Sequence, residues 1–171
     1  MIKKTFEAIV IFVLVTSVNA ANCNFEKIGI RNDMDEISMP GDGSCLFWAI
    51  AAGENIAKGR DMKYQLAKRK DELREQVVAE LRFGKYDEEL SLMLASDDTP
   101  YNNAVDYIAA VRKGMWGGDL ELVVLSSALK INIINYTYTG AVIKYPETLQ
   151  HAETIRIYYT GYHYNLLLPR N

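Results

Sequence analysis

The sequence predicts an α+β fold in which a small central, mostly antiparallel sheet is packed between helices. Residues 62–83 carry apolar side chains at helical spacing, whereas the chain from residue 131 onward forms short runs of β-branched and aromatic residues separated by glycine-containing turns. No repeat, low-complexity tract or Pro/Ser-rich linker interrupts residues 21–171. We therefore expect one domain, with the helices early in the chain and the strands late.

Residues 1–20 have the pattern of a secretory signal peptide. Lys3 and Lys4 precede an apolar run over residues 8–18, and the small residue Ala20 ends a suitable cleavage site. The run is too short to span a bilayer, which needs about 20 apolar residues. We expect a secreted or exported protein with no stable membrane insertion after cleavage; an uncleaved anchor or a buried terminal helix is the alternative.

Three helices are predicted from residue 62 onward, in addition to the one that begins near Cys45. The first covers residues 62–83, with charged residues 68–72 interpreted as its solvated face. The second is expected to have Thr99 as its N-cap and Pro100 at its first position, and to end near residue 112. Asp119 is expected to cap a third helix that ends near residue 129. The residues expected to face inward in the first two helices are Leu66, Leu73, Val77, Leu81, Ala104, Val105, Ile108 and Val111.

Four strands are predicted in the C-terminal part of the chain, at residues 131–136, 141–145, 154–159 and 162–168. Gly140 and Gly161 provide turns within this region. This arrangement places the hairpins after the helices.

Composition limits the chemistry that the chain can support. The 171 residues suffice for one core without a disulfide or metal staple, and the net charge of −3 argues against a basic surface for nucleic acid. Two cysteines exclude a disulfide framework and a four-thiolate zinc site, and two histidines leave little for another metal site. We expect no metal, no cofactor and no nucleic-acid partner.

Cys45 lies at the start of a predicted apolar helix, directly after a turn that contains Gly41 and Gly43. Unpaired backbone N–H groups and the helix dipole stabilise a thiolate at such a position, and the Asp42–Cys45 loop could hold an oxyanion. The alternative is an inert buried cysteine after a helix-capping Asp42. A disulfide between Cys23 and Cys45 is also open, because an exported protein meets oxidising conditions.

His163 and Asn165 lie two residues apart in the last predicted strand, so their side chains should share a face. Asn165 could then accept the ring N–H of His163 and orient the imidazole toward a nucleophile, which makes a complete Cys–His–Asn set. A core histidine with satisfied hydrogen bonds is the alternative. His151 lies in a polar connection and is interpreted as a surface residue.

Three segments resemble motifs of the ovarian tumour (OTU) family of cysteine proteases. Gly41-Asp42-Gly43-Ser44-Cys45-Leu46-Phe47 is similar to its D-G-x-C-L-F/Y motif, Trp116-Gly117-Gly118-Asp119-Leu120-Glu121-Leu122 to its W-G-x-x-x-E-L segment, and His163-Tyr164-Asn165 to its closing H-Y-N/D. The resemblance covers about residues 25–171. Ser44 stands where Asn is common in the family, and Trp48 stands where Arg or His is common.

The resemblance implies a papain-like OTU fold and a thiol-dependent hydrolase that cleaves ubiquitin or a ubiquitin-like modifier from conjugates. It implies Cys45 as the nucleophile, His163 as general base and then acid, and Asn165 as the orienting residue. Around them, the implied oxyanion-hole and cleft residues are Asp42, Gly43, Ser44, Trp116 and Gly117, while Glu121 is expected to serve helix packing. The expected partners are ubiquitin or polyubiquitin conjugates, bound by a monomer without a cofactor.

Two other functions remain open at this point. The signal peptide favours a secreted general thiol peptidase, because ubiquitin is a cytosolic eukaryotic protein. A non-catalytic ubiquitin-binding module is the second, although such a module does not need Cys45, His163 and Asn165 together. Export of a deubiquitinase is consistent with a host-directed effector that is delivered to a eukaryotic cell.

Overall fold

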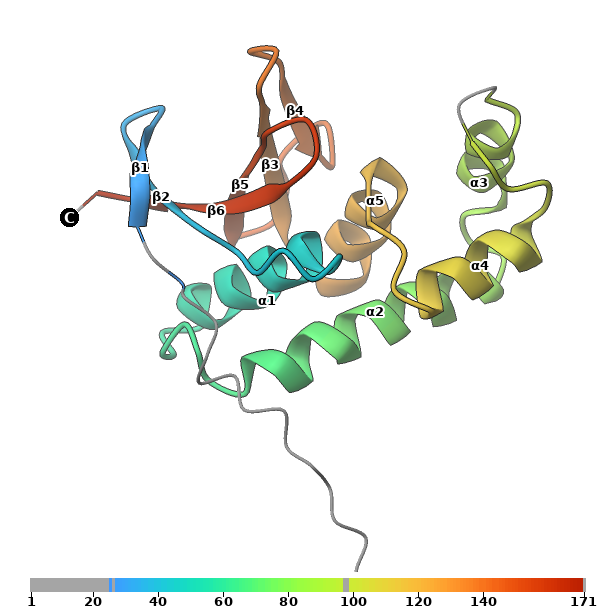
Figure 1. Cartoon of the computed structure of the whole chain (residues 1–171), viewed down its shortest axis with the longest axis horizontal. Coiled ribbons are helices and arrows are strands. Elements are labelled where there is room, and N and C mark those ends of the chain that lie inside the picture. The colour runs from blue at the N-terminus through green and yellow to red at the C-terminus, as the bar shows by residue number, and fades with distance from the viewer. Residues whose placement is uncertain (1–24, 26, 97–98, 171) are drawn as a thin grey trace, which may run out of the picture.

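The computed structural model describes residue 25, residues 27–96 and residues 99–170, and it confirms the α+β fold (Figure 1). The described residues form one six-stranded sheet in the order β1-β2-β6-β5-β3-β4. Only the β3–β5 pair is parallel, so the sheet is mostly antiparallel as predicted. The strands are β1 (Lys27–Arg31), β2 (Met34–Ile37), β3 (Asn132–Thr137), β4 (Val142–Tyr145), β5 (Thr154–Tyr159) and β6 (Tyr164–Pro169).

The sheet begins with a hairpin that the sequence analysis did not predict. Strands β1 and β2 are joined by Asn32 and Asp33, which both have positive φ (49° and 59°), the backbone of a tight two-residue hairpin turn. Strand β2 pairs with β6, so that Glu36 lies opposite Leu167. The N-terminal hairpin therefore lies beside the strand that follows His163.

Helices α1 (Cys45–Ala57) and α5 (Asp119–Leu129) pack on the same face of the sheet. The absence of a side chain at Gly53 lets α1 approach Ile155 on this face closely, because a Cβ at Gly53 would lie 2.5 Å from Ile155 Cγ2. Tyr145 on β4 donates to the Asp119 carboxylate at the start of α5. In the described residues the helices thus lie on one side of the sheet and do not enclose it, which differs from the predicted packing between helices (Figure 1).

The opposite face has no helix packed against it among the described residues, yet it carries buried side chains. Tyr158 and Leu167 point to this face and are buried, although they lie outside the core shared with the helices. The guanidinium of Arg31 lies 3.8 Å from the centre of the Tyr158 ring. Arg31 of the first hairpin thereby covers part of this face.

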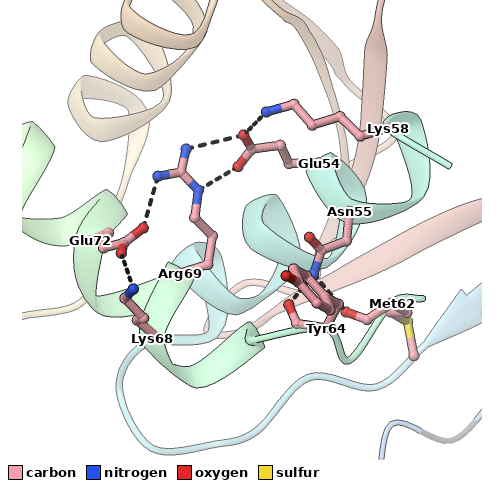
Figure 2. Close-up of polar contacts among 8 residues, drawn as sticks. All are labelled: Glu54, Asn55, Lys58, Met62, Tyr64, Lys68, Arg69 and Glu72. Atoms are coloured by element: carbon pink, nitrogen blue, oxygen red, sulfur yellow. Dashed lines mark hydrogen bonds and ion pairs between the residues drawn. The ribbon is translucent and has the colours of Figure 1, made fainter. Parts of the chain in front are cut away.

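Helix α2 (Leu66–Arg82) confirms the predicted buried stripe of Leu66, Leu73, Val77 and Leu81 but begins later than residue 62. The residues before it form a turn instead, because Asn55 donates to the carbonyls of Met62 and Tyr64 (Figure 2). Gln65 at the N-cap then has a positive φ of 45°.

The charged run of α2 is only partly a solvated face. Arg69 turns toward α1 and binds the buried carboxylate of Glu54 through two nitrogens, at 2.7 and 3.1 Å (Figure 2). Lys58 binds the same carboxylate, and Arg69 also reaches Glu72. This ion-pair group ties α1 to α2.

Two further helices, α3 (Asp87–Leu94) and α4 (Ala104–Arg112), lie beyond α2 and α5. The predicted start of α4 was wrong, because Asn103 is the N-cap and its side chain accepts the backbone N–H of Asp106. Val105 was predicted to face inward but is exposed, whereas Ile108 and Val111 are buried as predicted. Helix α3 was not predicted, since Leu90 is its only fully buried residue.

No helix in the described part of the chain is long and apolar enough to cross a membrane. The predicted signal peptide, residues 1–20, lies outside the described residues, as does Cys23.

Candidate active site

Cys45 is the first residue of α1, as predicted, and it carries a free thiol that is 8% exposed. Burial raises the pKa of this thiol above its ordinary value. Hydrogen bonds from the backbone N–H groups of Tyr164, Leu46 and Cys45 itself act against that rise, and the Asp42 carboxylate adds to it. The helix N-terminus therefore stabilises the thiolate, as expected, but burial has the larger effect in the unliganded fold. A base is needed to ionise the thiol near neutral pH.

Asp42 does not cap α1, whose N-cap is Ser44. Its carboxylate accepts the backbone N–H of Ser44 at 2.9 Å and the indole N–H of Trp48 at 2.9 Å. Trp48, which stands where the family often has Arg or His, thus supplies the donor that holds Asp42. The Ser44 N–H donates to Asp42 and is therefore not free to bind an oxyanion. The N–H groups of Cys45 and Leu46 face the sulfur, so they are the candidate oxyanion donors at this end of the site.

Residues 42–45, which we call the nucleophile loop because they end at the predicted nucleophile Cys45, pack directly against the Trp116–Gly118 turn. Gly43 has a φ of +82°, and a Cβ on it would lie 3.3 Å from the carbonyl oxygen of Gly114 and 3.4 Å from the Trp116 indole. A Cβ on Gly117 would likewise lie 3.1 Å from Leu46 Cδ1. Glycine at both positions lets the two segments meet.

Glu121 holds the far end of the Trp116–Gly118 turn, a role that the sequence analysis had not assigned to it. Its buried carboxylate accepts the Gly118 N–H at 2.7 Å and the Tyr107 hydroxyl at 2.6 Å. Burial raises the pKa of Glu121, while the bonds from Tyr107 and Gly118 lower it. Burial and the neighbouring Glu121 carboxylate raise the pKa of Tyr107, so Tyr107 remains a hydroxyl donor.

A cleft of about 410 Å³ opens in front of Cys45. One wall is the predicted Trp116 and Gly117, and Trp116 is 64% exposed. The aromatic residues of the other walls were not predicted from the sequence. The tyrosine-rich C-terminal strands were the pattern that could have indicated an aromatic cleft. These aromatic residues are Tyr138, Tyr159, Tyr162 and Tyr164. Of the predicted oxyanion and cleft residues, Asp42, Gly43 and Ser44 are not among the residues that line this cleft.

His163 directly precedes β6, in a turn with Thr160. The backbone N–H of His163 donates to Thr160 Oγ1 at 3.1 Å, and its carbonyl accepts the Thr160 N–H at 2.9 Å. The next residue, Tyr164, donates its N–H toward the Cys45 sulfur, which brings the His163 backbone to the site. Among the described side chains, however, no hydrogen bond joins the His163 ring to Cys45 or Asn165. Catalytic hydrogen bonds of this kind are often long or poorly aligned in an unliganded enzyme and tighten when substrate binds.

Asn165 is 3% exposed and both ends of its amide are held from β2 and the segment after it. Its Oδ1 accepts the Met39 N–H at 3.3 Å, and its Nδ2 donates to Glu36 Oε1 at 2.8 Å. Glu36 is buried as well and binds Arg31 at 2.9 Å. A carboxylate only accepts hydrogen bonds, so this contact fixes the amide with its oxygen away from Glu36. No local pattern could reveal Glu36, which lies 129 residues from Asn165.

The family model for OTU-like cysteine proteases matches residues 40–164, most of the chain. The chain belongs to the OTU-like cysteine protease family. The match includes the nucleophile loop, the Trp116–Gly118 turn and His163 of this OTU domain, which confirms the resemblance found in the sequence.

Two named relatives are similar over most of the OTU domain. The chain is 31% identical over 153 residues to ovarian tumor domain-containing deubiquitinating enzyme 4 of Arabidopsis thaliana, covering 81% of this chain and 44% of that protein. It is 25% identical over 161 residues to ubiquitin thioesterase otu2 of Schizosaccharomyces pombe, covering 90% and 51%. The chain thus spans about half the length of these relatives.

Solved structures agree with the fold. An ovarian tumor domain in complex with ubiquitin is 28% identical, with a TM-score of 0.57 over 78% of this chain and 69% of that one. An OTU deubiquitinase from Wolbachia pipientis wMel bound to ubiquitin is 15% identical, with a TM-score of 0.60 over 81% and 97%. The second likeness shows the fold alone, whereas the first structure is an OTU domain of this fold that binds ubiquitin.

Proposed function

We propose that this chain is a deubiquitinase, a thiol hydrolase that removes ubiquitin or a ubiquitin-like modifier from conjugates. The observation that carries the proposal is Cys45 at a helix N-terminus, with three backbone N–H groups directed at its sulfur and an aromatic cleft in front of it. The named relatives and the ubiquitin-bound OTU structure support the choice of substrate.

The reaction begins when the His163 ring takes the proton of the Cys45 thiol. The thiolate attacks the carbonyl carbon of the isopeptide or peptide bond, and the N–H groups of Cys45 and Leu46 stabilise the oxyanion. His163 then gives its proton to the leaving amine, and a thioester remains. Water activated by His163 attacks the thioester, which frees the carboxylate of the modifier and restores the thiol. Each proton transfer by a positioned base is worth roughly 10²–10⁴-fold in rate.

Asn165 orients this histidine in the proposed mechanism. Its amide oxygen can accept a ring N–H and so select the tautomer that leaves the other nitrogen free for Cys45. A neutral amide stabilises the imidazolium less than a carboxylate would, so the ion pair with the thiolate is weaker. The raised pKa of Cys45 in the unliganded fold is consistent with a nucleophile that is ionised on demand.

A covalent probe tests the proposal. The full chain is incubated under reducing conditions with ubiquitin that bears a C-terminal thiol-reactive warhead, next to Cys45→Ala. We expect a covalent adduct with the wild type and none with the variant. Ubiquitin binding without an adduct would instead indicate a binding module.

A secreted general thiol peptidase is the second candidate, because residues 1–20 have the signal-peptide pattern. Cleavage of unrelated peptides that depends on Cys45, without reaction with the ubiquitin probe, would favour it. We also propose that the protein is exported and acts as a host-directed effector. N-terminal sequencing of protein recovered from the medium should find the cleaved chain beginning after Ala20, and retention of the full chain inside cells would reject export.

A further inference from the structure

Two arginines on α2 lie five residues apart and serve different parts of the molecule. Arg69 is partly exposed and pairs with the carboxylates of Glu54 and Glu72, which ties α1 to α2 (Figure 2). Arg74 is 6% exposed, and its hydrogen-bond acceptors in the described residues are all uncharged. Burying a cation without a directly paired anion costs free energy. Helix packing alone therefore does not explain why an arginine stands at this position.

The guanidinium of Arg74 donates to both segments that form the active site. One nitrogen, Nη2, reaches the Gly43 carbonyl at 3.3 Å and Ser44 Oγ at 3.0 Å, in the loop just before Cys45. The other, Nη1, reaches the Met115 carbonyl at 2.8 Å, just before Trp116, and the Val111 carbonyl at 2.9 Å. One rigid, planar group therefore links the nucleophile loop to the cleft wall.

The packing around Arg74 leaves the guanidinium little freedom. Its Cζ lies over the Phe47 ring, 4.2 Å from the ring centre, so the aromatic face also attracts the cation. The linked segments also touch each other directly, since Gly43 lies against Gly114 and Trp116. A shift of the guanidinium would therefore move both segments relative to one another.

We propose that Arg74 is a positioning residue of the active site, whose guanidinium sets the distance between the nucleophile loop and the Trp116–Gly118 turn and places a fixed positive charge near the Cys45 sulfur. This inference rests on the proposed function, because it assigns Cys45 as the nucleophile. It identifies a residue, on a helix that contributes nothing to the cleft surface, that controls the geometry of the reaction.

The charges around Arg74 support the second part of the proposal. Burial lowers the pKa of Arg74, but the carboxylates of Glu121, Asp42 and Asp71 and the Cys45 sulfur raise it, and an arginine stays protonated in any case. Without this cation, the thiolate would keep the Asp42 carboxylate near it and would lose the positive charge that is bonded to the loop just before Cys45. The other titratable groups that face Cys45 are Tyr159 and Tyr164, with His163 next in the chain.

Three variants of the full chain separate geometry, charge and stability. Arg74→Met removes the charge and every hydrogen bond, whereas Arg74→Lys keeps a charge and loses the planar fork. Arg69→Met is the matched control, because it breaks a comparable set of hydrogen bonds on the same helix away from the site. The thermal unfolding midpoint of each variant is recorded so that activity is compared among folded proteins.

Two readouts are measured for each variant. The first is the pH profile of Cys45 alkylation by iodoacetamide, followed by mass mapping of the peptide that contains Cys45. The second is kcat/KM on a fluorogenic ubiquitin substrate. Arg74→Met should move the alkylation profile to higher pH and lower kcat/KM about 100-fold. Arg74→Lys should keep the wild-type profile yet lower kcat/KM about 10-fold. Arg69→Met should lower the unfolding midpoint and leave both readouts unchanged.

The alkylation readout does not involve ubiquitin, so it tests Arg74 even if the wild type cleaves no ubiquitin substrate and the proposed function fails. A folded Arg74→Met with the wild-type profile and kcat/KM would overturn the inference, and so would equal losses in Arg69→Met. If Arg74→Met does not fold, the kcat/KM of Arg74→Lys tests the positioning role instead. A wild-type kcat/KM in Arg74→Lys would reject that role.

Discussion

Replacing Glu36 by alanine would remove the carboxylate that holds the amide of Asn165. The contact joins Nδ2 to Oε1 at 2.8 Å, and the two residues are 5% and 3% exposed, so water has little access to replace it. A hydrogen bond to a charged group contributes about 1.5–3 kcal/mol. Without Glu36, the Nδ2 group of Asn165 would stay buried and would lose its acceptor. We therefore expect Glu36→Ala to lower the free energy of unfolding by about 1.5–3 kcal/mol.

The same change should affect catalysis, because Asn165 would keep only its bond from the Met39 N–H. An amide free to rotate would orient His163 poorly, and a misplacement of 1 Å in an active site costs about 100-fold in rate. We expect kcat/KM to fall by about 10–100-fold. Glu36→Gln keeps the shape and a neutral acceptor, so its loss of stability should be smaller, about 1 kcal/mol.

Denaturant unfolding and kcat/KM on a ubiquitin substrate measure the two effects. Asp35→Asn is the neighbouring control, because Asp35 pairs with the half-exposed Lys27, and such a pair contributes about 0–1 kcal/mol. Wild-type stability together with wild-type kcat/KM in Glu36→Ala would refute the reasoning, as would a larger effect in Asp35→Asn.

Three further outcomes are expected. Gly53→Ala should destabilise the fold by about 1–3 kcal/mol in denaturant unfolding, because its Cβ would lie 2.5 Å from Ile155 Cγ2; an unchanged midpoint would contradict the packing. His163→Ala should lower turnover by several orders of magnitude and Asn165→Ala by less, and near-normal turnover without the histidine would reject the mechanism. Burial raises the pKa of Cys45, so its folded thiol ionises at higher pH than the unfolded one. The stability that the protonated Cys45 thiol contributes is therefore present below the pKa of the unfolded chain and is lost as the pH rises toward the pKa of the folded protein. Denaturant unfolding of the wild type and of Cys45→Ala across alkaline pH measures this loss.

Local patterns predicted the parts of the fold that depend on local spacing. The stripe of Leu66, Leu73, Val77 and Leu81 follows from helical periodicity, and the strands from residue 131 onward follow from β-branched runs. Local patterns failed where one tertiary contact outweighed them. The start of α2 is delayed because Asn55, on another helix, holds the carbonyls of the turn before it.

The candidate site divides in the same way. Cys45, His163 and Asn165 could be named from their motifs, because the chemistry requires a cysteine, a histidine and an orienting side chain, and these residue types stand at short spacing in those motifs. Glu36 and Arg74 could not be named, because their contacts with the site cross 129 and about 30 residues of chain. Their sequence surroundings are an ordinary strand and a charged helix.

The sequence by itself determined the fold class, the family resemblance and the choice of Cys45 as the candidate nucleophile, because each depends on residue types at short spacing. Only the tertiary structure decided that Asp42 binds Trp48, that Asn165 is held by Glu36, and that the nucleophile loop and the cleft wall share one buried arginine. It also showed that burial outweighs the helix N-terminus at Cys45. Desolvation and long-range hydrogen bonds depend on which distant segments pack together, and that information is not contained in any local stretch of the chain.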